Sequence, residues 1–380
     1  LEPNMSKISL IASYLIFAIL LIFLMLNYEG FPGVSSEHPL GFFGWYDQGQ
    51  YLKQLKDLMS NGVTALSSGI YPPGYMILAI PFTIFSQFFT DNYFQYSLIV
   101  LNTILVISSV IIFSHTLGKN KAIFFLLLLS FLIGFSDIVR NALIIPWSSS
   151  VTLFVASLFY YIISSDGIMF KQRLNEIAIL IFYGIMLSIL LHTRPQDFVI
   201  ISFSSVLYLI FTFYKYNGIG RNVYIPILSF VLVEIVFYIL ADGLAFGGIY
   251  SNSEHSFLIN GHFDKLLGII SGDQTYGILS QSLMDRGVTL AVVIVTIFIA
   301  GIVFSKVEIK VALILWFVIY LSFSDFGPHN FTYYELFHYF KTPLIISLAV
   351  FIKSCSYNKM FALSVLTFLT LIIFGLTWFV

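Results

Sequence analysis

Long runs of apolar residues, separated by short polar connections, cover most of this sequence of 380 residues. A helix needs about 20 mostly apolar residues in succession to cross a lipid bilayer. By this criterion we expect about eleven membrane-spanning helices. They are predicted near residues 8–26, 96–116, 122–135, 151–163, 177–191, 198–213, 223–240, 288–304, 311–323, 342–352 and 361–380. The predicted fold class is an all-α polytopic membrane protein, with residues 1–380 forming a single integral membrane domain.

Basic residues mark one side of the predicted helices. Cytoplasmic loops of membrane proteins carry an excess of Lys and Arg. The basic residues that recur in the short connections are Lys7, Lys119, Lys121, Lys171, Arg173, Lys215, Arg221, Lys306, Lys310, Lys353 and Lys359. These connections are therefore predicted to face the cytoplasm. The two long connections, at about residues 28–95 and 241–287, then face outward, with shorter ones around Asp137, Arg194 and Asp325. This outer side as a whole holds most of the acidic residues and histidines.

One further segment, residues 72–89, is also apolar enough to span the membrane. It contains Pro72, Pro73, Gly74 and Pro81, which disfavour a continuous spanning helix. We interpret it as a helix that lies on the outer leaflet or dips into it. The alternative, a full span, would place the first loop in the cytoplasm, and the distribution of Lys and Arg fits either arrangement.

Composition strengthens the membrane interpretation and narrows the range of partners. Hydrophobic residues make up 58% of the chain and charged residues 10%. A globular domain with this composition would not be soluble in water. The formal net charge of −1 gives no indication of a nucleic-acid partner. Cys355 is the only cysteine, so the sequence offers neither a disulfide framework nor a thiolate metal site.

The first long connection carries a short amphipathic pattern around Asp47. Helical spacing gives one apolar face made of Asp47, Tyr51, Leu55 and Leu58. Lys53 falls on another face of the same helix. A carboxylate on the apolar face can act as a general base that takes a proton from an attacking hydroxyl. The alternative is that Asp47 caps the helix by accepting hydrogen bonds from its first amides.

Residues 71–75, Tyr-Pro-Pro-Gly-Tyr, open the apolar segment that follows this pattern. Together with the aromatic-Asp-x-x-x-Tyr-Leu pattern around Asp47, the motif resembles the GT-C class of polytopic glycosyltransferases. The resemblance covers residues 1–100 by motif and the rest of the chain by topology only. It implies an inverting enzyme that takes a sugar from a polyprenyl-phosphate carrier at the outer face of the membrane, with Asp47 as the catalytic base. It also implies a sugar pocket shaped by Trp45, Tyr51 and Tyr71.

The second outer loop departs from the pattern of this family. Some members carry an acidic Asp-x-Asp-like metal site there, whereas residues 144–150 are Ile-Ile-Pro-Trp-Ser-Ser-Ser. We therefore expect no metal or other cofactor, and basic residues that neutralise the carrier phosphate instead. The outward-facing candidates for binding the donor are Arg194, Lys341, Arg140 and His338. The alternative for the cations is contact with lipid headgroups or snorkelling, and for Arg194 a salt bridge to Asp197.

Glu234 lies inside a predicted span, where an acidic side chain is costly and faces a cavity or a partner. It can line the substrate groove or pair with a Tyr or Arg in the bundle. It is also compatible with an alternative function, that of a transporter or flippase. The sequence contains no internal repeat of the kind typical of transporters. The favoured hypothesis is a glycosyltransferase of the cell membrane, with an active site on the extracytoplasmic face and a glycan or glycolipid acceptor. The other alternative is a polysaccharide polymerase that uses lipid-linked repeats.

Overall fold

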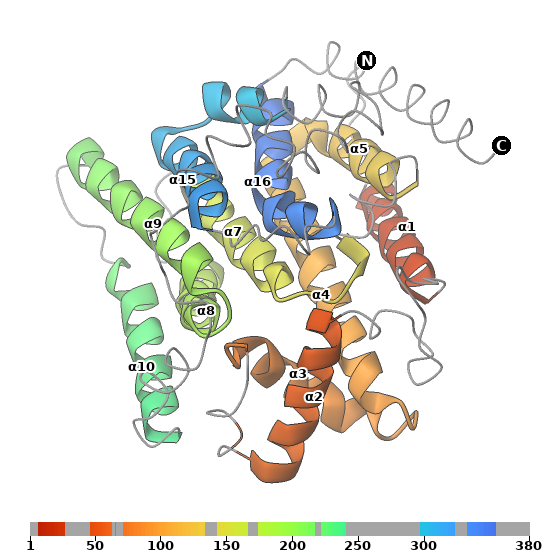
Figure 1. Cartoon of the computed structure of the whole chain (residues 1–380). Coiled ribbons are helices and arrows are strands. Elements are labelled where there is room, and N and C mark those ends of the chain that lie inside the picture. Colours follow the sequence, from red (N-terminus) through yellow and green to blue (C-terminus); the bar gives the residue numbers. More distant parts are fainter. Residues whose placement is uncertain are drawn as a thin grey trace, which may run out of the picture. The chain divides into compact units, whose positions relative to one another are not determined.

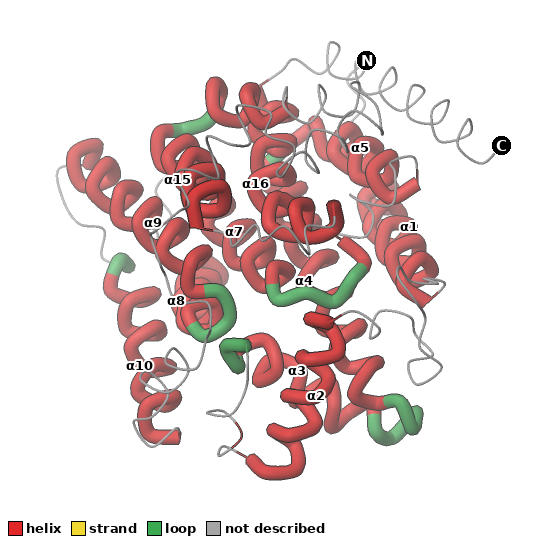
Figure 2. Tube along the Cα trace, viewed as in Figure 1, coloured by secondary structure: helices red, strands yellow, loops and turns green. Residues whose placement is uncertain are grey.

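The computed structural model describes residues 7–26, 46–62, 65, 71–133, 143–165, 174–216, 222–240, 297–323 and 333–354 (Figure 1). Every regular element in these ranges is helical and none is a strand (Figure 2). The predicted all-α class is confirmed for this part of the chain. The helices are α1 (Lys7–Leu26), α2 (Tyr46–Asn61), α3 (Gly74–Ser86), α4 (Tyr93–Thr116), η3 (Gly118–Asn120), α5 (Lys121–Ile133), α7 (Ser149–Ser164), α8 (Leu174–Leu191), α9 (Pro195–Tyr216), α10 (Tyr224–Leu240), α15 (Val307–Phe323) and α16 (Tyr333–Ser354).

Three of the described helices are long and apolar enough to cross a membrane: α4, α8 and α9, with 24, 18 and 22 residues. The apolar part of α1 and the helices α3, α7 and α10 are shorter. The predicted count of about eleven spans is therefore not confirmed. The predicted span at 361–380, and most of the one at 288–304, lie outside the described residues.

The chain divides into two compact units, each built from segments that are distant in sequence. One consists of Ile22–Ser109 and Ile145–Ser256, and we call it the α8 unit. The other consists of Leu1–Leu21, Val110–Ile144 and Phe257–Val380, and we call it the α16 unit.

The helix α8 is the centre of its unit, where it packs against α3, α7, α9 and α10. Nearly every side chain of α7 is buried, as expected for a helix that is apolar on all sides. The contact between α8 and α10 is close because Gly184 has no side chain. A Cβ atom at Gly184 would lie 2.2 Å from the backbone oxygen of Pro226.

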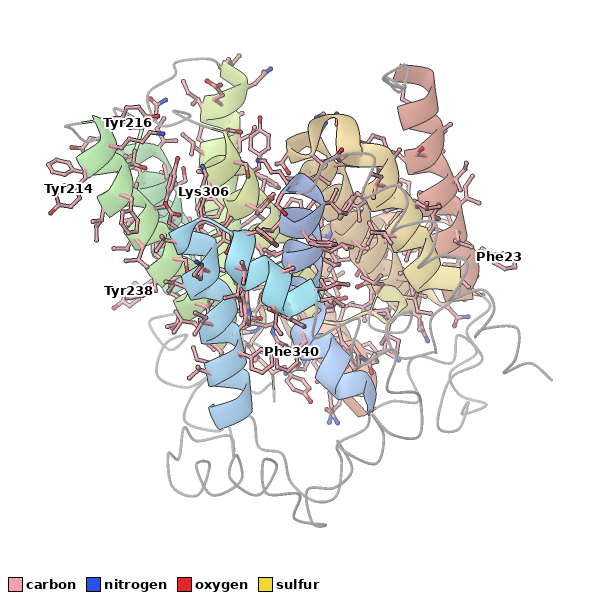
Figure 3. All side chains as sticks on the ribbon, turned by 90° about the horizontal axis from the view of Figure 1, so that it is seen from above. Phe23, Tyr214, Tyr216, Tyr238, Lys306 and Phe340 are labelled. Carbon is pink, nitrogen blue, oxygen red and sulfur yellow. The ribbon has the colours of Figure 1, made fainter. Side chains whose placement is uncertain are left out.

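Large apolar side chains cover the outer faces of α9 and α10. Figure 3 shows Tyr214 and Tyr238 extending away from these helices. The exposed aliphatic and Phe side chains of the two helices are Val199, Phe203, Val206, Ile210, Phe211, Phe213, Ile227, Leu228, Val231, Leu232, Ile235, Val236 and Ile239. Soluble monomers rarely expose contiguous apolar surface of this extent. These faces, like the three long apolar helices, indicate association with a membrane.

In the α16 unit, α16 packs against α5 and α15. Phe298, Phe317 and Phe340 form an aromatic cluster there, with ring centroids 5.4 to 6.2 Å apart. The amide Nδ2 of Asn120 donates a hydrogen bond of 2.8 Å to the backbone oxygen of Ile352 near the end of α16. Contacts of this kind hold α16 in place inside its own unit.

Candidate functional site

The short turn between α8 and α9 carries the basic residue Arg194. Thr193 and Arg194 follow the end of α8, and Pro195 opens α9, a position at which proline is preorganised for a helix. The hydroxyl of Thr193 donates to the backbone oxygen of Ile189 at 2.6 Å, and the backbone N–H of Arg194 donates to the oxygen of Leu190 at 2.7 Å. The turn is therefore tied to the last turn of α8.

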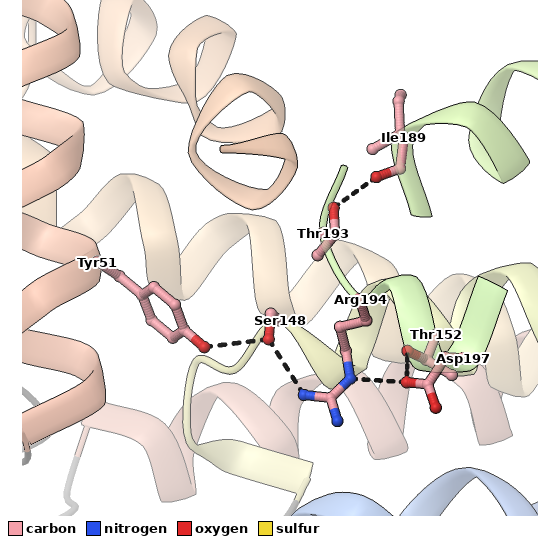
Figure 4. A network of polar contacts seen from close by, with 7 residues as sticks. All are labelled: Tyr51, Ser148, Thr152, Ile189, Thr193, Arg194 and Asp197. Atoms are coloured by element: carbon pink, nitrogen blue, oxygen red, sulfur yellow. Dashed lines mark hydrogen bonds and ion pairs between the residues drawn. The ribbon is translucent and has the colours of Figure 1, made fainter. Parts of the chain in front are cut away.

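Arg194 is buried, with 8% of its surface exposed, and it pairs with Asp197 in the first turn of α9. Its Nε donates to Oδ2 of Asp197 at 2.6 Å, and the hydroxyl of Thr152 on α7 donates to the same oxygen at 2.5 Å (Figure 4). The salt bridge considered for Arg194 as an alternative is thus present. Asp197 neutralises part of the guanidinium charge and occupies Nε. Anion binding by Arg194 therefore depends on the orientation of its Nη1 and Nη2 groups.

The second anchor of Arg194 is Ser148, which precedes α7. Nη1 of Arg194 donates to Oγ of Ser148 at 3.4 Å, and the hydroxyl of Tyr51 on α2 lies 3.0 Å from the same oxygen (Figure 4). Ser148 belongs to the stretch 144–150, all of whose residues are buried. This stretch, which lacks acidic residues, supplies a hydroxyl that joins α2 to the α8–α9 turn.

The tyrosines of the Tyr-Pro-Pro-Gly-Tyr motif pack on Tyr51. The ring centroid of Tyr51 lies 5.1 Å from that of Tyr71 and 5.2 Å from that of Tyr75. Nε2 of Gln54, one turn further along α2, donates to the backbone oxygen of Tyr71 at 3.3 Å. The structure therefore brings together Tyr51 and Tyr71, two residues that the sequence assigned to one sugar pocket.

Gly74, the first residue of α3, fixes that helix against the α8–α9 turn. Its N–H donates to the backbone oxygen of His192 at 2.7 Å. A Cβ atom at Gly74 would lie 2.3 Å from Oγ1 of Thr193, 2.7 Å from the oxygen of Ile189 and 2.8 Å from the oxygen of His192. The glycine of the motif is required by this close approach of the two backbones.

Three buried polar atoms near this network have no hydrogen-bond partner in the described part of the chain: Oε1 of Gln48, Oε1 of Gln54 and the hydroxyl of Tyr75. Nε2 of Gln48 donates to the backbone oxygen of Pro146 at 3.3 Å, which leaves its carbonyl end for another donor. Burial raises the pKa of Tyr75 well above its ordinary value, and neighbouring Tyr51 raises it further, so the phenol stays neutral. Buried polar atoms are usually hydrogen-bonded, and exceptions need an explanation.

The amphipathic pattern predicted for α2 is confirmed for Tyr51 and Leu55, which are buried. Its buried face includes Gln48, Tyr51 and Leu55, and Lys53 is exposed. Asp47 is the second residue of α2 as the structure describes it. The side chain of Asp47 lies outside what the structure describes.

For the remaining predicted site residues, the structure describes less. Trp45 and Arg140 lie outside the described residues, and His338 is described only as a backbone position on α16. Lys341, also on α16, is 2% exposed and belongs to the α16 unit. Within the residues that the structure describes, no three His, Cys, Asp or Glu side chains form a group that would hold a metal ion.

Ser148, Gln48 and Tyr75 were not selected from the sequence. Gln48 directly follows Asp47, and Tyr75 closes the Tyr-Pro-Pro-Gly-Tyr motif, so their positions next to recognised residues were the available signal. Ser148 offered less, because it is one serine in a run of three.

Comparison with known proteins adds no relative to this picture: no protein-family model, curated protein or solved structure matches the chain.

Proposed function

We propose that the protein is a GT-C-like inverting glycosyltransferase of the cell membrane, which transfers a sugar from a polyprenyl-phosphate carrier to an extracytoplasmic glycan or glycolipid. The observation that carries the proposal is the buried polar network that joins three separate segments of the chain. Tyr51 on α2, Ser148 ahead of α7 and Arg194 after α8 are linked by hydrogen bonds. A few convergent polar groups in otherwise apolar surroundings are typical of a substrate site.

In the proposed reaction, Asp47 takes the proton of an acceptor hydroxyl as the hydroxyl oxygen attacks the anomeric carbon of the donor sugar. The bond from that carbon to the phosphate oxygen breaks, and polyprenyl phosphate leaves with the electron pair. Attack and departure on opposite faces of the sugar invert the anomeric centre. Arg194 holds the carrier phosphate through its guanidinium group. No divalent cation is proposed. Lys341, Arg140 and His338, which belong to the α16 unit, stay candidates for donor binding from the sequence alone.

The sugar itself would satisfy two of the buried atoms that lack described partners, those of Gln48 and Tyr75. A sugar hydroxyl can donate to Oε1 of Gln48, and another can exchange a hydrogen bond with the neutral phenol of Tyr75. Tyr71 and Trp45 are proposed to supply aromatic faces for the C–H groups of the ring. Sites built to pair buried polar groups with a substrate discriminate strongly against analogues that lack the matching hydroxyl.

A transporter or flippase is the second candidate, and Glu234 is the observation that favours it. Both carboxylate oxygens of Glu234 are hydrogen-bonded, one to Ser188 and one to His192. This arrangement suits a fixed acid better than one that releases a proton in every transport cycle. A polymerase that uses lipid-linked repeats would share the donor chemistry of the glycosyltransferase and differ in the length of the transferred unit.

The proposal is tested by incubating the purified protein with a radiolabelled polyprenyl-phosphate-sugar and measuring loss of label from the lipid. Asp47→Asn should lower turnover by at least about 100-fold, the lower range for a lost general base. Its stability in detergent and its donor binding should be nearly unchanged, because Asn retains the size of Asp.

The matched control is Asp57→Asn, which makes the same chemical change on the same helix, at a position that the predicted apolar face leaves out. Asp57→Asn should retain full turnover. An Asp47→Asn protein with near-normal turnover would remove the central residue of the proposal and return Asp47 to a structural role.

A further inference from the structure

Glu234 places a carboxylate on α10, a helix whose outer face is apolar and exposed. Leu232, Ile235 and Val236 beside it are exposed, whereas the side chain of Glu234 is only 15% exposed. Its Oε1 accepts a hydrogen bond of 2.5 Å from the hydroxyl of Ser188 on α8. The acid therefore faces α8, although intramembrane acids are costly and are kept only where a partner or cavity is present.

The second partner of this carboxylate is His192, the first residue after α8. Nε2 of His192 donates to Oε2 of Glu234 at 3.0 Å, and the imidazole packs against Phe237 in a tilted arrangement with ring centroids 4.3 Å apart. Glu234 was expected to pair with a Tyr or Arg if it had a partner in the bundle. The observed partners are a Ser and a His, because the end of α8 is the polar segment that α10 reaches.

His192 connects α10 to the candidate site through its backbone. While its side chain is held by Glu234 and Phe237, its carbonyl oxygen accepts the hydrogen bond from the N–H of Gly74 at 2.7 Å. Arg194 follows two residues later. A change in the position of His192 would therefore move both the start of α3 and the guanidinium of Arg194.

We propose that Glu234 is a positioning residue that, through His192, fixes the turn carrying Arg194 and so sets the geometry of the donor-phosphate site. The consequence for the donor rests on the glycosyltransferase function proposed above, whereas the fixing of the turn does not. The alternative role for an acid at this depth is proton transfer, and substitution can separate the two roles.

Glutamine at position 234 preserves the positioning contacts and removes the ability to titrate. Its amide oxygen can accept from Ser188, and its NH₂ group can donate to Nε2 of the other neutral tautomer of His192. Leucine removes both hydrogen bonds at similar size. A positioning residue thus tolerates Glu234→Gln far better than Glu234→Leu, whereas a proton carrier tolerates neither.

The direct test is amide hydrogen exchange of the purified protein in detergent, followed in peptides that cover Gly74 and residues 192–194. Glu234→Leu should speed exchange at these amides by about tenfold or more, because local opening replaces a fixed turn. Glu234→Gln should change it by less than about threefold. The control is Ser229→Ala on the same helix, whose hydroxyl donates to the backbone oxygen of Ile225 within α10. Exchange at the turn should not change in this variant.

If Glu234→Leu does not yield folded protein, Ser188→Ala removes one partner of the carboxylate without burying a new charge. Exchange at the turn should then rise by a few-fold, with little change in the first half of α9. Unchanged exchange at the turn in the folded variant, or an equal rise throughout α8, α9 and α10, would overturn the proposal.

The kinetic readout uses the radiolabelled polyprenyl-phosphate-sugar. Glu234→Leu should raise the donor KM by about tenfold or more while kcat stays within about threefold, and Glu234→Gln should stay close to wild type in both. A Glu234→Gln protein with a normal turn but no turnover would make Glu234 a proton carrier and overturn the positioning role. If exchange responds as expected while no protein, wild type included, transfers the sugar, the positioning role stands and the proposed function fails.

Discussion

Replacement of Gly74 by alanine tests the contact on which the candidate site is built. The added Cβ would lie 2.3 Å from Oγ1 of Thr193, 2.7 Å from the oxygen of Ile189 and 2.8 Å from the oxygen of His192. Two of these three atoms are backbone carbonyl oxygens, which cannot turn aside as a side chain can. The start of α3 must therefore move away from the turn, and the 2.7 Å hydrogen bond from Gly74 to His192 must lengthen or break.

The expected loss combines two effects. Forcing a methyl group into a packed contact costs about 1–3 kcal/mol, and the weakened backbone hydrogen bond adds about 0.5–1.5 kcal/mol. Gly74→Ala should therefore lower the free energy of unfolding by about 2–4 kcal/mol. Equilibrium unfolding in mixed micelles, followed by circular dichroism as denaturing detergent is added, measures this difference.

Two comparisons separate the steric effect from a general effect of replacing glycine. At Gly62 a Cβ would meet no atom within 4 Å, but φ is +64°, so Gly62→Ala should cost only the left-handed strain of about 1–2 kcal/mol. Adding Thr193→Ala to Gly74→Ala removes the nearest obstacle and leaves both carbonyl oxygens, so it should restore less than half of the loss. A Gly74→Ala protein as stable as the wild type, or fully rescued by Thr193→Ala, would refute the reasoning.

Three further predictions concern the phosphate ligand, the metal and the topology. Arg194→Gln should raise the donor KM by about tenfold to a hundredfold and also lower the unfolding temperature, because Asp197 loses its buried cation; an unchanged KM would remove Arg194 from the donor site. Turnover should survive EDTA, since the sequence offers no evident cluster of hard oxygen ligands; loss of turnover that Mn²⁺ restores would contradict this. In a cysteine-free background, single cysteines at Asn61 and Asn252 should react with an impermeant thiol reagent on intact cells, and one at Asn217 should not; the reverse labelling would overturn the predicted topology.

The helices were predictable where an apolar run is long and ends in polar residues. The run predicted at 177–191 corresponds to α8, Leu174–Leu191, and the run at 198–213 to α9, Pro195–Tyr216. The prediction was poorest for α16, which was expected to begin near 342 and begins at Tyr333. Polar and charged residues such as Lys341 interrupt the apolar run there, but backbone hydrogen bonds continue the helix regardless of side-chain polarity.

Only the local relations of the candidate site were accessible from the sequence. Arg194 and Asp197 are three residues apart at the start of a helix, a spacing at which side chains meet, so their pairing was foreseeable. The proximity of Tyr51 and Tyr71 was predictable from the resemblance, which assigned both to one sugar pocket: Tyr51 belongs to the pattern around Asp47, and Tyr71 begins the Tyr-Pro-Pro-Gly-Tyr motif. The bond between His192 and Glu234 links residues 42 apart on different helices, and nothing in either local pattern selects the partner.

Under the proposed function, the buried pair of Arg194 and Asp197 has a role beyond stability. Replacing a buried ion pair with well-packed apolar residues is often neutral or stabilising, because desolvation of two charges offsets their attraction. Only 10% of the residues of this chain are charged, so a buried ion pair stands out against its mostly apolar composition. Each member of the pair also has a second partner: the hydroxyl of Thr152 donates to Asp197, and Oγ of Ser148 accepts from Arg194. Because both contacts fix the guanidinium of Arg194 before a ligand binds, less side-chain conformational entropy is lost when an anion binds there.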